Sequence, residues 1–492
     1  MKRKARGIPN TITISYIAFL MLCTLIFHLL LAESLPQNPE SFFAMRQAEH
    51  IAETGKPLYN DPLSYGGKHN AFNPGYFYLL AIGGILGGMT GYILIAALMY
   101  SLLPLSVFLI SQRIAGTGPA LAGATISIVL PALYDVTLNS IYNGVIAFPL
   151  VLFALYFFHS ESKFTIHYVL CILFLALFSG QILTLALCLF VYAAVLKIEN
   201  IPLTKPKKEL IIFTIFLAIW SQFLIYKQAL TAHGTSIIWQ NIPEQLLKTY
   251  FDAVTFLDIA AGVGLLVIVA AVIAIYHTAF KTKDSTIYIY ITAAGVITIL
   301  LLLRLIRFDI GLLYLGVFGA IFSAVFLKMT YAYILKTKAS PHANILVVVC
   351  ALLLISITAT GISLLPEKPV TSENLIKVLQ WSAEHTPTDS VILSTLEEGD
   401  LIAAIAKRKN VIDSNFLLAR NAADRLEDVK RIYTSTSTVR AIELIDTYGI
   451  SHILFAGAKS FTPALRYEEC IRPLFQTGEV ILYEVICNVE IL

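Results

Sequence analysis

The chain has 492 residues, of which 57% are hydrophobic and only 14% are charged, and its mean hydropathy is +0.75. Soluble domains carry about 25% charged residues, so this composition excludes a soluble enzyme for most of the length. A bilayer, unlike the core of a soluble protein, accommodates this much apolar surface. The formal net charge of +3 is too small to indicate a nucleic-acid partner.

Eleven apolar segments are read as membrane-spanning helices, each of which needs roughly 20 apolar residues. They lie at 12–32, 92–114, 117–135, 143–158, 166–179, 181–197, 209–227, 256–278, 286–303, 309–335 and 344–365. The first has no A-x-A cleavage site before Glu33, so we expect it to stay as an anchor rather than to be removed as a signal peptide. The sequence therefore predicts a multi-pass α-helical membrane protein.

Basic residues indicate the orientation, because Lys and Arg gather in cytoplasmic loops. Four of them precede the first span: Lys2, Arg3, Lys4 and Arg6. With the N-terminus in the cytoplasm, eleven spans place the lysines of 205–208, 281–283 and 336–338 on that side as well. The segment 74–90 would be a twelfth span and would reverse the later loops. Because it is short and Gly-rich, we predict a helix that lies in or partly enters the outer leaflet; an ordinary span is the alternative.

After Leu365 the chain becomes polar, and the periodicity of 366–492 alternates between strand and helix. This predicts a small extracytoplasmic α/β domain that follows the membrane region 1–365. Strands are expected at 390–395, 410–412, 451–455 and 479–486, and helices at 372–385, 398–408, 421–433 and 437–447. No G-x-G-x-x-G or Walker A pattern indicates nucleotide binding. Cys470 and Cys487 lie in this polar region, and either one disulfide or two reduced thiols fit the sequence.

The first outer loop, within 33–91, has the densest group of candidate functional residues. Pro39 favours the start of a helix, and Glu40 in its first turn suits the helix dipole. A carboxylate at the membrane surface can act as a general base or a metal ligand; a solvated acid that caps the helix is the alternative. Four more candidates follow in the same loop: Arg46, Asp61, Tyr65 and His69.

Two arginines late in the membrane part, Arg304 and Arg307, are the second candidate group. A guanidinium suits bidentate binding of a phosphate, and the spacing of three predicts that both lie on one helix face. Snorkelling to the headgroups, or pairing with Asp309, is the alternative. Asp135, in the short outer loop 135–142, is a weaker candidate for a metal ligand, with a structural role as its alternative.

The order of these features resembles the GT-C superfamily of polyprenyl-phosphate-dependent membrane glycosyltransferases, above all the catalytic subunit of oligosaccharyltransferase and its smaller prokaryotic relatives. The family's D-x-W-F-x-x-R is matched in spacing by residues 40–46 (E-S-F-F-A-M-R). Its later R-F is matched by Arg307-Phe308, and its W-x-x-x-x-T-P by residues 381–387. The resemblance implies a GT-C-like fold of about eleven spans plus an interfacial helix at 74–90, with a C-terminal extracytoplasmic α/β domain.

Two motifs of oligosaccharyltransferases are not found at the corresponding places. The second outer loop has Ile141-Tyr142-Asn143 where the family has D-N-E or D-x-D, so a second metal carboxylate is missing and dependence on Mg or Mn is open. The outer region has T-L-E-E-G at 395–399 where the family has W-W-D-Y-G, which argues against recognition of an asparagine sequon in the usual form.

The resemblance implies a glycosyltransferase in the cell membrane that moves a sugar from a polyprenyl (dolichyl-type) phosphate carrier to a lipid, glycan or protein acceptor on the outer face. Two alternatives stay open. One is an oligosaccharyltransferase-like enzyme with a peptide groove between the outer domain and the loop 228–255. The other is a flippase for lipid-linked sugars or a non-catalytic subunit of a cell-envelope complex.

Each candidate residue has an expected role in the glycosyltransferase hypothesis. Glu40 is the expected general base or, with Asp135, a ligand of a divalent cation. Arg307, supported by Arg304, is expected to bind the donor phosphate. The remaining four residues are expected to position the loop or the substrate, with Arg46 and Asp61 ordering the loop and Tyr65 or His69 contacting the sugar.

Overall fold

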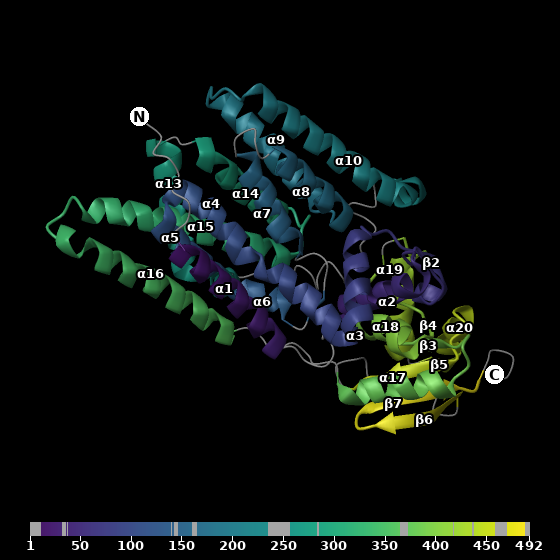
Figure 1. Cartoon of the computed structure of the whole chain (residues 1–492). Coiled ribbons are helices and arrows are strands. Elements are labelled where there is room, and N and C mark those ends of the chain that lie inside the picture. The colour runs from purple at the N-terminus through teal and green to yellow at the C-terminus, as the bar shows by residue number, and fades with distance from the viewer. Residues whose placement is uncertain are drawn as a thin grey trace.

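The computed structural model describes most of the chain, in the ranges 11–31, 36, 38–138, 140–141, 146–159, 165–234, 256–282, 285–364, 372–416, 418–434, 437–457 and 470–487. Apolar helices form a bundle at one end of the molecule, and a β-sheet with helices around it lies at the other (Figure 1). The helix α2 (Pro39–Thr54) lies in the sheet region although it follows the first predicted span directly.

Each of the eleven predicted spans coincides with an apolar helix or with two helices joined at a bend. In the described ranges, five helical segments are long and apolar enough to cross a membrane, two bent pairs bring the number to seven, and four further apolar helices have 10–17 residues. These helices make the chain a membrane protein, whereas the number of crossings stays a prediction. The helices are α1 (Thr11–Leu30), α3 (Gly75–Ser101), α4 (Leu103–Ala115), α5 (Thr117–Ile128), α6 (Pro131–Thr137), α7 (Ala147–Phe158), α8 (Thr165–Phe178), α9 (Ile182–Ile198), α10 (Lys205–His233), α12 (Phe256–Val263), α13 (Leu265–His277), α14 (Ser285–Leu302), α15 (Phe308–Ile334) and α16 (Ala343–Thr360).

The predicted interfacial segment 74–90 is the first arm of α3. Non-helical backbone at Gly87 and at Gly88, with φ +56°, breaks α3 there. Beside the break, a Cβ on Gly91 would lie only 1.8 Å from the carbonyl oxygen of Gly83. These two residues would be about 12 Å apart along a straight helix, so the first arm is folded back against the second. Its position relative to a lipid leaflet stays a prediction.

The helix α15 is the centre of the bundle. It packs against α4, α5, α13, α14 and α16. In its most apolar stretch of 18 residues, 89% of the residues are buried, compared with 17% in the segment that contains α16. Because other helices surround α15, the residues at its N-terminus are held at a fixed place at the end of the bundle. Arg307 directly precedes this helix.

The C-terminal region contains a five-stranded sheet in the order β4-β3-β5-β7-β6. The strands β4, β3 and β5 are parallel, whereas β7 is antiparallel to both β5 and β6. Each of the four predicted strands and four predicted helices has a counterpart here. The strands are β3 (Val391–Leu393), β4 (Lys409–Asn410), β5 (His452–Phe455), β6 (Ile471–Thr477) and β7 (Val480–Val485), and the helices are α17 (Glu373–His385), α18 (Leu396–Leu401), η8 (Ile402–Ala406), α19 (Ala422–Thr434) and α20 (Thr438–Thr447).

Successive residues of a strand point to opposite faces of the sheet, and this sheet is apolar on both faces. Ile392 packs with residues of α17 in one apolar cluster, whereas Leu393 packs with residues of α19 and α20 in another. The first outer loop contributes to both clusters, since Phe42 belongs to the first and Tyr65 to the second. The change of composition at residue 366 is therefore not a boundary in the packing.

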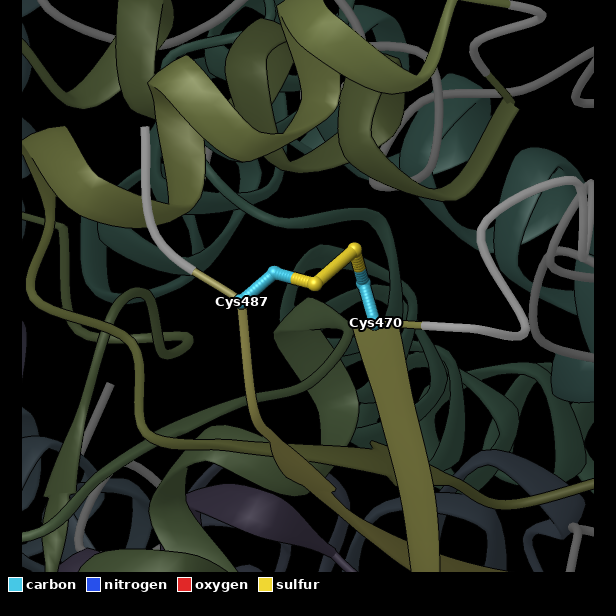
Figure 2. Close-up of a disulfide and its surroundings, with 2 residues drawn as sticks. All are labelled: Cys470 and Cys487. Atoms are coloured by element: carbon cyan, nitrogen blue, oxygen red, sulfur yellow. A yellow bond between two sulfur atoms is a disulfide. The ribbon is translucent and has the colours of Figure 1, made fainter. Parts of the chain in front are cut away.

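The strand β6 was not predicted, because Arg472 and Pro473 interrupt the alternating pattern. It is the edge strand, where proline is tolerated, and the register with β7 shifts between Pro473 and Phe475. Cys470 directly precedes β6 and Cys487 follows β7, and the two form a disulfide with their Cα atoms 4.8 Å apart (Figure 2). Of the two alternatives left open by the sequence, the structure has the oxidised pair.

Candidate functional site

The N-terminus of α2 carries the predicted general base. The side chain of Asn38 caps the helix by accepting a hydrogen bond of 2.9 Å from the N–H of Glu40, and Pro39 is the first helical residue. Proline suits this position because it has no N–H that would stay unpaired, so the helix begins where the sequence predicted. Phe42 and Ala48 are completely buried. Their burial fixes α2 in place, and with it the position of Glu40.

Arg307 joins the N-termini of α2 and α15. Its Nη1 donates a hydrogen bond of 2.6 Å to Oε1 of Glu40, although the two residues are 267 positions apart in the sequence. Its Nε and Nη2 donate to Oδ1 and Oδ2 of Asp309 at 3.2 and 2.7 Å. The three side chains are 25–27% exposed. Charges interact more strongly in such a partly desolvated place than in open water.

One oxygen of Glu40 has no hydrogen-bond partner among the described residues. Its Oε2 is buried, and no donor in the described part of the chain reaches it. A buried acceptor without a donor is costly, so native proteins rarely leave one unless it has a role. This oxygen is suited to accept a hydrogen bond from a bound molecule, such as a hydroxyl group.

The second outer loop approaches the same place. The N–H of Ile141 donates a hydrogen bond of 2.9 Å to Oγ of Ser41, the neighbour of Glu40. Tyr142 and Asn143, which follow Ile141, lie outside the described residues, as do most of the loop 228–255 and the basic N-terminus.

Arg304 does not share a helix face with Arg307, and that prediction is wrong. The helix α14 ends at Leu302, and Arg304 lies in an exposed turn with φ +57°. Residues three apart lie on one face only inside a continuous helix, whereas here one helix has ended and the next begins at Phe308. A role of Arg304 in phosphate binding stays a prediction.

Arg46 and Asp61 form a second ion pair further along α2. Nη1 of Arg46 donates to Oδ2 of Asp61 at 2.6 Å, and Nη2 donates to Oδ1. Burial alone would raise the pKa of Asp61, but the hydrogen bonds from Arg46 and from the N–H groups of Leu63 and Ser64 hold it below its usual value. The pair links α2 to the short hairpin of β1 (Asn60–Asp61) and β2 (Lys68–His69), consistent with the predicted ordering of the loop.

Tyr65 is buried in the C-terminal region and is only 4% exposed. Its hydroxyl donates to the carbonyl of Asp413 at 2.9 Å, and its N–H donates to Oδ1 of Asn410 at 2.8 Å. In this structure Tyr65 cannot contact a sugar, because its hydroxyl and ring are already enclosed. It anchors the first outer loop instead. His69 stacks on Tyr59 and is hydrogen-bonded through Nδ1 to the side chain of Asn60, and its contact with a sugar stays a prediction.

A buried lysine, which the sequence analysis missed, lies beside Tyr65. The Nζ of Lys68 is 3.7 Å from Oδ1 of Asp413, and both side chains are 2% exposed. Burial lowers the pKa of Lys68, whereas the negative charge of Asp413 opposes that shift. Burial and the nearby Asp413 raise the pKa of Asp400 well above its usual value. This buried cluster attaches the hairpin of β1 and β2 to the C-terminal region.

The described residues around Glu40 do not fit a divalent cation. Mg²⁺ and Mn²⁺ prefer several oxygen ligands, yet no three His, Cys, Asp or Glu side chains gather in one place within the described ranges. Glu40 and Asp309 face one guanidinium instead, and this group supplies the positive charge. Asp135, the other predicted ligand, is a half-buried residue of α6.

Models of protein families give no match to the chain, and a search of curated protein sequences gives none. Solved structures do match. The oligosaccharyltransferase AglB from Archaeoglobus fulgidus, in complex with an inhibitory peptide and a dolichol-phosphate, has a TM-score of 0.70 and 14% identity, over 90% of this chain and 69% of that one. ArnT from Cupriavidus metallidurans, bound to undecaprenyl phosphate, has a TM-score of 0.59 and 10% identity, over 96% and 97%. The arabinofuranosyltransferase AftD from Mycobacteria has a TM-score of 0.57 and 13% identity, over 96% and 40%.

The chain has the GT-C fold. All three neighbours are GT-C glycosyltransferases, so the resemblance seen in the sequence is confirmed for the fold. At 10–14% identity the likeness does not extend to substrates. Asp309 was named in the sequence analysis only as a partner for arginine, and its place directly after R-F was the available signal. No sequence pattern pointed to Lys68 and Asp413.

Proposed function

We propose that the chain is a membrane glycosyltransferase that moves a sugar from a polyprenyl-phosphate carrier to an acceptor on the outer face of the membrane. The hydrogen bond between Arg307 and Glu40 carries this proposal. It joins a cation suited to a phosphate and a carboxylate suited to a hydroxyl, at the end of an apolar bundle where a lipid carrier would present its headgroup.

The proposed reaction is a displacement at the anomeric carbon. Glu40 accepts the proton of the acceptor hydroxyl, the hydroxyl oxygen forms the new bond to the anomeric carbon, and the bond from that carbon to the phosphate oxygen breaks. Arg307 stabilises the negative charge on the departing polyprenyl phosphate. Attack from the face opposite to the leaving group inverts the configuration of the sugar.

The orientation of the chain is part of the proposal. The connection between α15 and α16, which contains Lys336 and Lys338, lies at the end of the bundle away from the sheet (Figure 1). Lysines favour the cytoplasmic side, which supports a cytoplasmic N-terminus and an extracytoplasmic sheet region. The cluster of Arg307 would then lie at the outer surface.

The acceptor is proposed to be a lipid or a glycan rather than a peptide sequon. The chain covers 97% of ArnT and 69% of AglB. The segment 395–399, which corresponds to the sequon-binding motif, forms the start of α18, and α18 packs against α2. Glu398 in this segment is hydrogen-bonded to Thr395, and burial raises its pKa. This arrangement supports a structural use of the segment.

Transfer from radiolabelled polyprenyl-phosphate sugars tests the proposal. Full-length protein in liposomes is incubated with the donor and with either a cell-envelope lipid and glycan extract or a sequon peptide. We expect Glu40→Gln to lower the transfer rate by about 10²–10⁴ and Arg307→Ala by about 10²–10³. Glu53→Gln, the same substitution at an exposed position of α2, is the matched control and should transfer like the wild type.

The outcomes separate the alternatives. Transfer to the extract that Glu40→Gln abolishes supports the proposal, and transfer to the peptide would favour the oligosaccharyltransferase alternative. Unchanged transfer by Glu40→Gln would remove Glu40 as the base. If no donor supports transfer while labelled lipid crosses the bilayer, the flippase alternative replaces the proposal.

A further inference from the structure

Two carboxylates share the guanidinium of Arg307, but they are attached to it differently. Asp309 accepts two hydrogen bonds, from Nε and Nη2, whereas Glu40 accepts one, from Nη1. The two carboxylates have nearly equal exposure, 26% and 25%. The difference between them therefore lies in geometry and not in access to solvent.

Asp309 is held by its own helix. Its Oδ1 also accepts a hydrogen bond of 2.8 Å from the N–H of Ile310, in the first turn of α15. Asp309 is two residues from Arg307, so the pair forms within one short segment of chain. Glu40 belongs to another element, and its second oxygen, Oε2, has no donor in the described part of the chain. The contact between Glu40 and Arg307 is thus the one that an incoming anion can replace.

We infer that the phosphate of the donor exchanges with Glu40 on Arg307, while Asp309 stays bound and holds the guanidinium in position. This inference rests on the proposed function of the site. A phosphate presents several oxygens to a guanidinium and can form two hydrogen bonds where Glu40 forms one. Asp309 is then a positioning residue, and Arg307 with Glu40 forms the pair that opens.

The exchange couples donor binding to the release of the base. In the structure described here, Oε1 of Glu40 accepts the hydrogen bond from Nη1 of Arg307 and is not available to an acceptor hydroxyl. When the phosphate replaces Glu40, the carboxylate is released beside the anomeric carbon of the bound donor. The acceptor hydroxyl therefore meets a carboxylate with both oxygens available only after the donor has bound.

Binding of farnesyl phosphate, a polyprenyl phosphate without a sugar, tests the exchange in full-length protein in nanodiscs. Glu40→Gln should bind it about threefold to tenfold more tightly than the wild type, because no carboxylate has to leave Arg307. Asp309→Asn removes the same charge from the same guanidinium and is the matched control. It should bind no more tightly than the wild type, because Asp309 is not displaced.

A third variant separates the contact from the charge. Glu40→Asp keeps the negative charge but shortens the side chain by one methylene, which withdraws the carboxylate from Nη1; we expect tighter binding, as for Glu40→Gln. Inorganic phosphate as a competitor distinguishes recognition of the headgroup alone from recognition of the whole lipid. The thermal unfolding of each variant is compared with that of the wild type, and Glu40→Asp keeps the test valid if Glu40→Gln does not fold.

Equal gains in affinity for Glu40→Gln and Asp309→Asn would overturn the exchange, because charge alone would then explain both. Unchanged affinity in both Glu40 variants would overturn it as well. These results concern binding and leave the transfer assay untouched. Conversely, absence of transfer in the wild type, together with the expected binding pattern, would refute the proposed function and leave the exchange on Arg307 standing.

Discussion

Two clusters of charged side chains lie along the first outer loop, and they differ in almost every physical respect. At the start of α2, Glu40 meets Arg307 and Asp309 at the end of the bundle, with each side chain about a quarter exposed. Further along the loop, Lys68 meets Asp413 with both side chains 2% exposed. The first cluster joins two elements by one replaceable hydrogen bond, whereas the second is enclosed in the C-terminal region.

The difference shows how one loop serves two purposes. An ion pair that has water nearby contributes little to stability but can exchange partners. A buried pair is costly to break, because the remaining charge is left without a partner. We therefore propose that the cluster of Arg307 serves binding and chemistry, whereas the cluster of Lys68 holds the loop against the C-terminal region. Arg46 and Asp61 connect the two through α2.

The largest expected effect comes from replacing the cation of each cluster by methionine. Lys68→Met should lower the free energy of unfolding by about 3–5 kcal/mol, because Asp413 loses its buried cation. Arg307→Met should lower it by about 1 kcal/mol or less, yet it should lower the transfer rate by about 10²–10³. Equilibrium denaturation of the full chain, followed by the fluorescence of Trp381, which stacks on Phe475 beside the sheet, measures both.

The control for this pair is Lys377→Met, which removes an exposed partner of Glu373 on α17. It should change neither stability nor transfer measurably. A Lys68→Met protein as stable as the wild type would show that the buried cluster does not fasten the loop.

Loss of the disulfide has the next largest expected effect, and it concerns the C-terminal region alone. Cys470 and Cys487 border the apolar cluster that includes Tyr65. Replacing both by serine should cost about 3 kcal/mol, as estimated for a loop of 17 residues, without changing the affinity for farnesyl phosphate. Alkylation followed by mass spectrometry is the check. Labelling of both Cys470 and Cys487 in native protein without reductant would contradict the disulfide.

A smaller effect is expected for the ion pair of Arg46 and Asp61, which connects the two clusters. Arg46→Lys keeps the charge but cannot form the two parallel hydrogen bonds to Asp61. We expect a loss of about 1–2 kcal/mol in stability and a severalfold lower kcat, because α2 no longer holds Glu40 in one position. The KM for the donor should stay the same. Arg431→Lys, at an exposed pair with Glu427, is the control and should change neither stability nor kcat. A changed KM in Arg46→Lys would indicate a direct role of Arg46 in binding the donor.

The fold was largely predictable from the sequence, because hydrophobic patterning governs it. Long apolar segments marked the bundle helices, and short apolar runs such as 390–395 and 451–455 marked strands that are buried on both faces. The strand β6 escaped because an edge strand accepts residues such as Pro473 that a central strand would exclude. The break in α3 at Gly87 and Gly88 was visible only as a Gly-rich composition.

The site was predictable in its residues but not in its contacts. Glu40 and Arg307 each carried a local signal, yet no local pattern says that residues 267 positions apart meet. The pairing of Arg304 with Arg307 failed because helical spacing was applied across the end of a helix. Tyr65 was expected to contact the sugar as a residue of the first outer loop in the glycosyltransferase hypothesis. It is buried because the C-terminal sheet, encoded more than 300 residues later, covers it.

The smallest expected effect is a pH dependence of the buried cluster. Asp400 accepts hydrogen bonds from Ser414, and both burial and the charge of Asp413 raise its pKa well above its usual 3.8. Below pH 3.8 the carboxyl is protonated in the folded and the unfolded chain. As the pH rises through the raised pKa of the folded state, the unfolded chain releases the proton more readily, so folding loses stability.

Asp400→Asn should remove this loss, since asparagine is neutral and still offers an oxygen to Ser414. The melting temperature of the wild type should therefore fall relative to that of Asp400→Asn by about 2–4 °C between pH 4 and pH 8. Asp389→Asn, at an exposed position, should follow the wild type at every pH. Because Lys68 is unchanged in the variant, its own titration largely cancels in the difference. If the melting temperatures of the wild type and Asp400→Asn change in parallel with pH, Asp400 is ionised in the folded chain. Lys68 then balances the charges of two carboxylates rather than one.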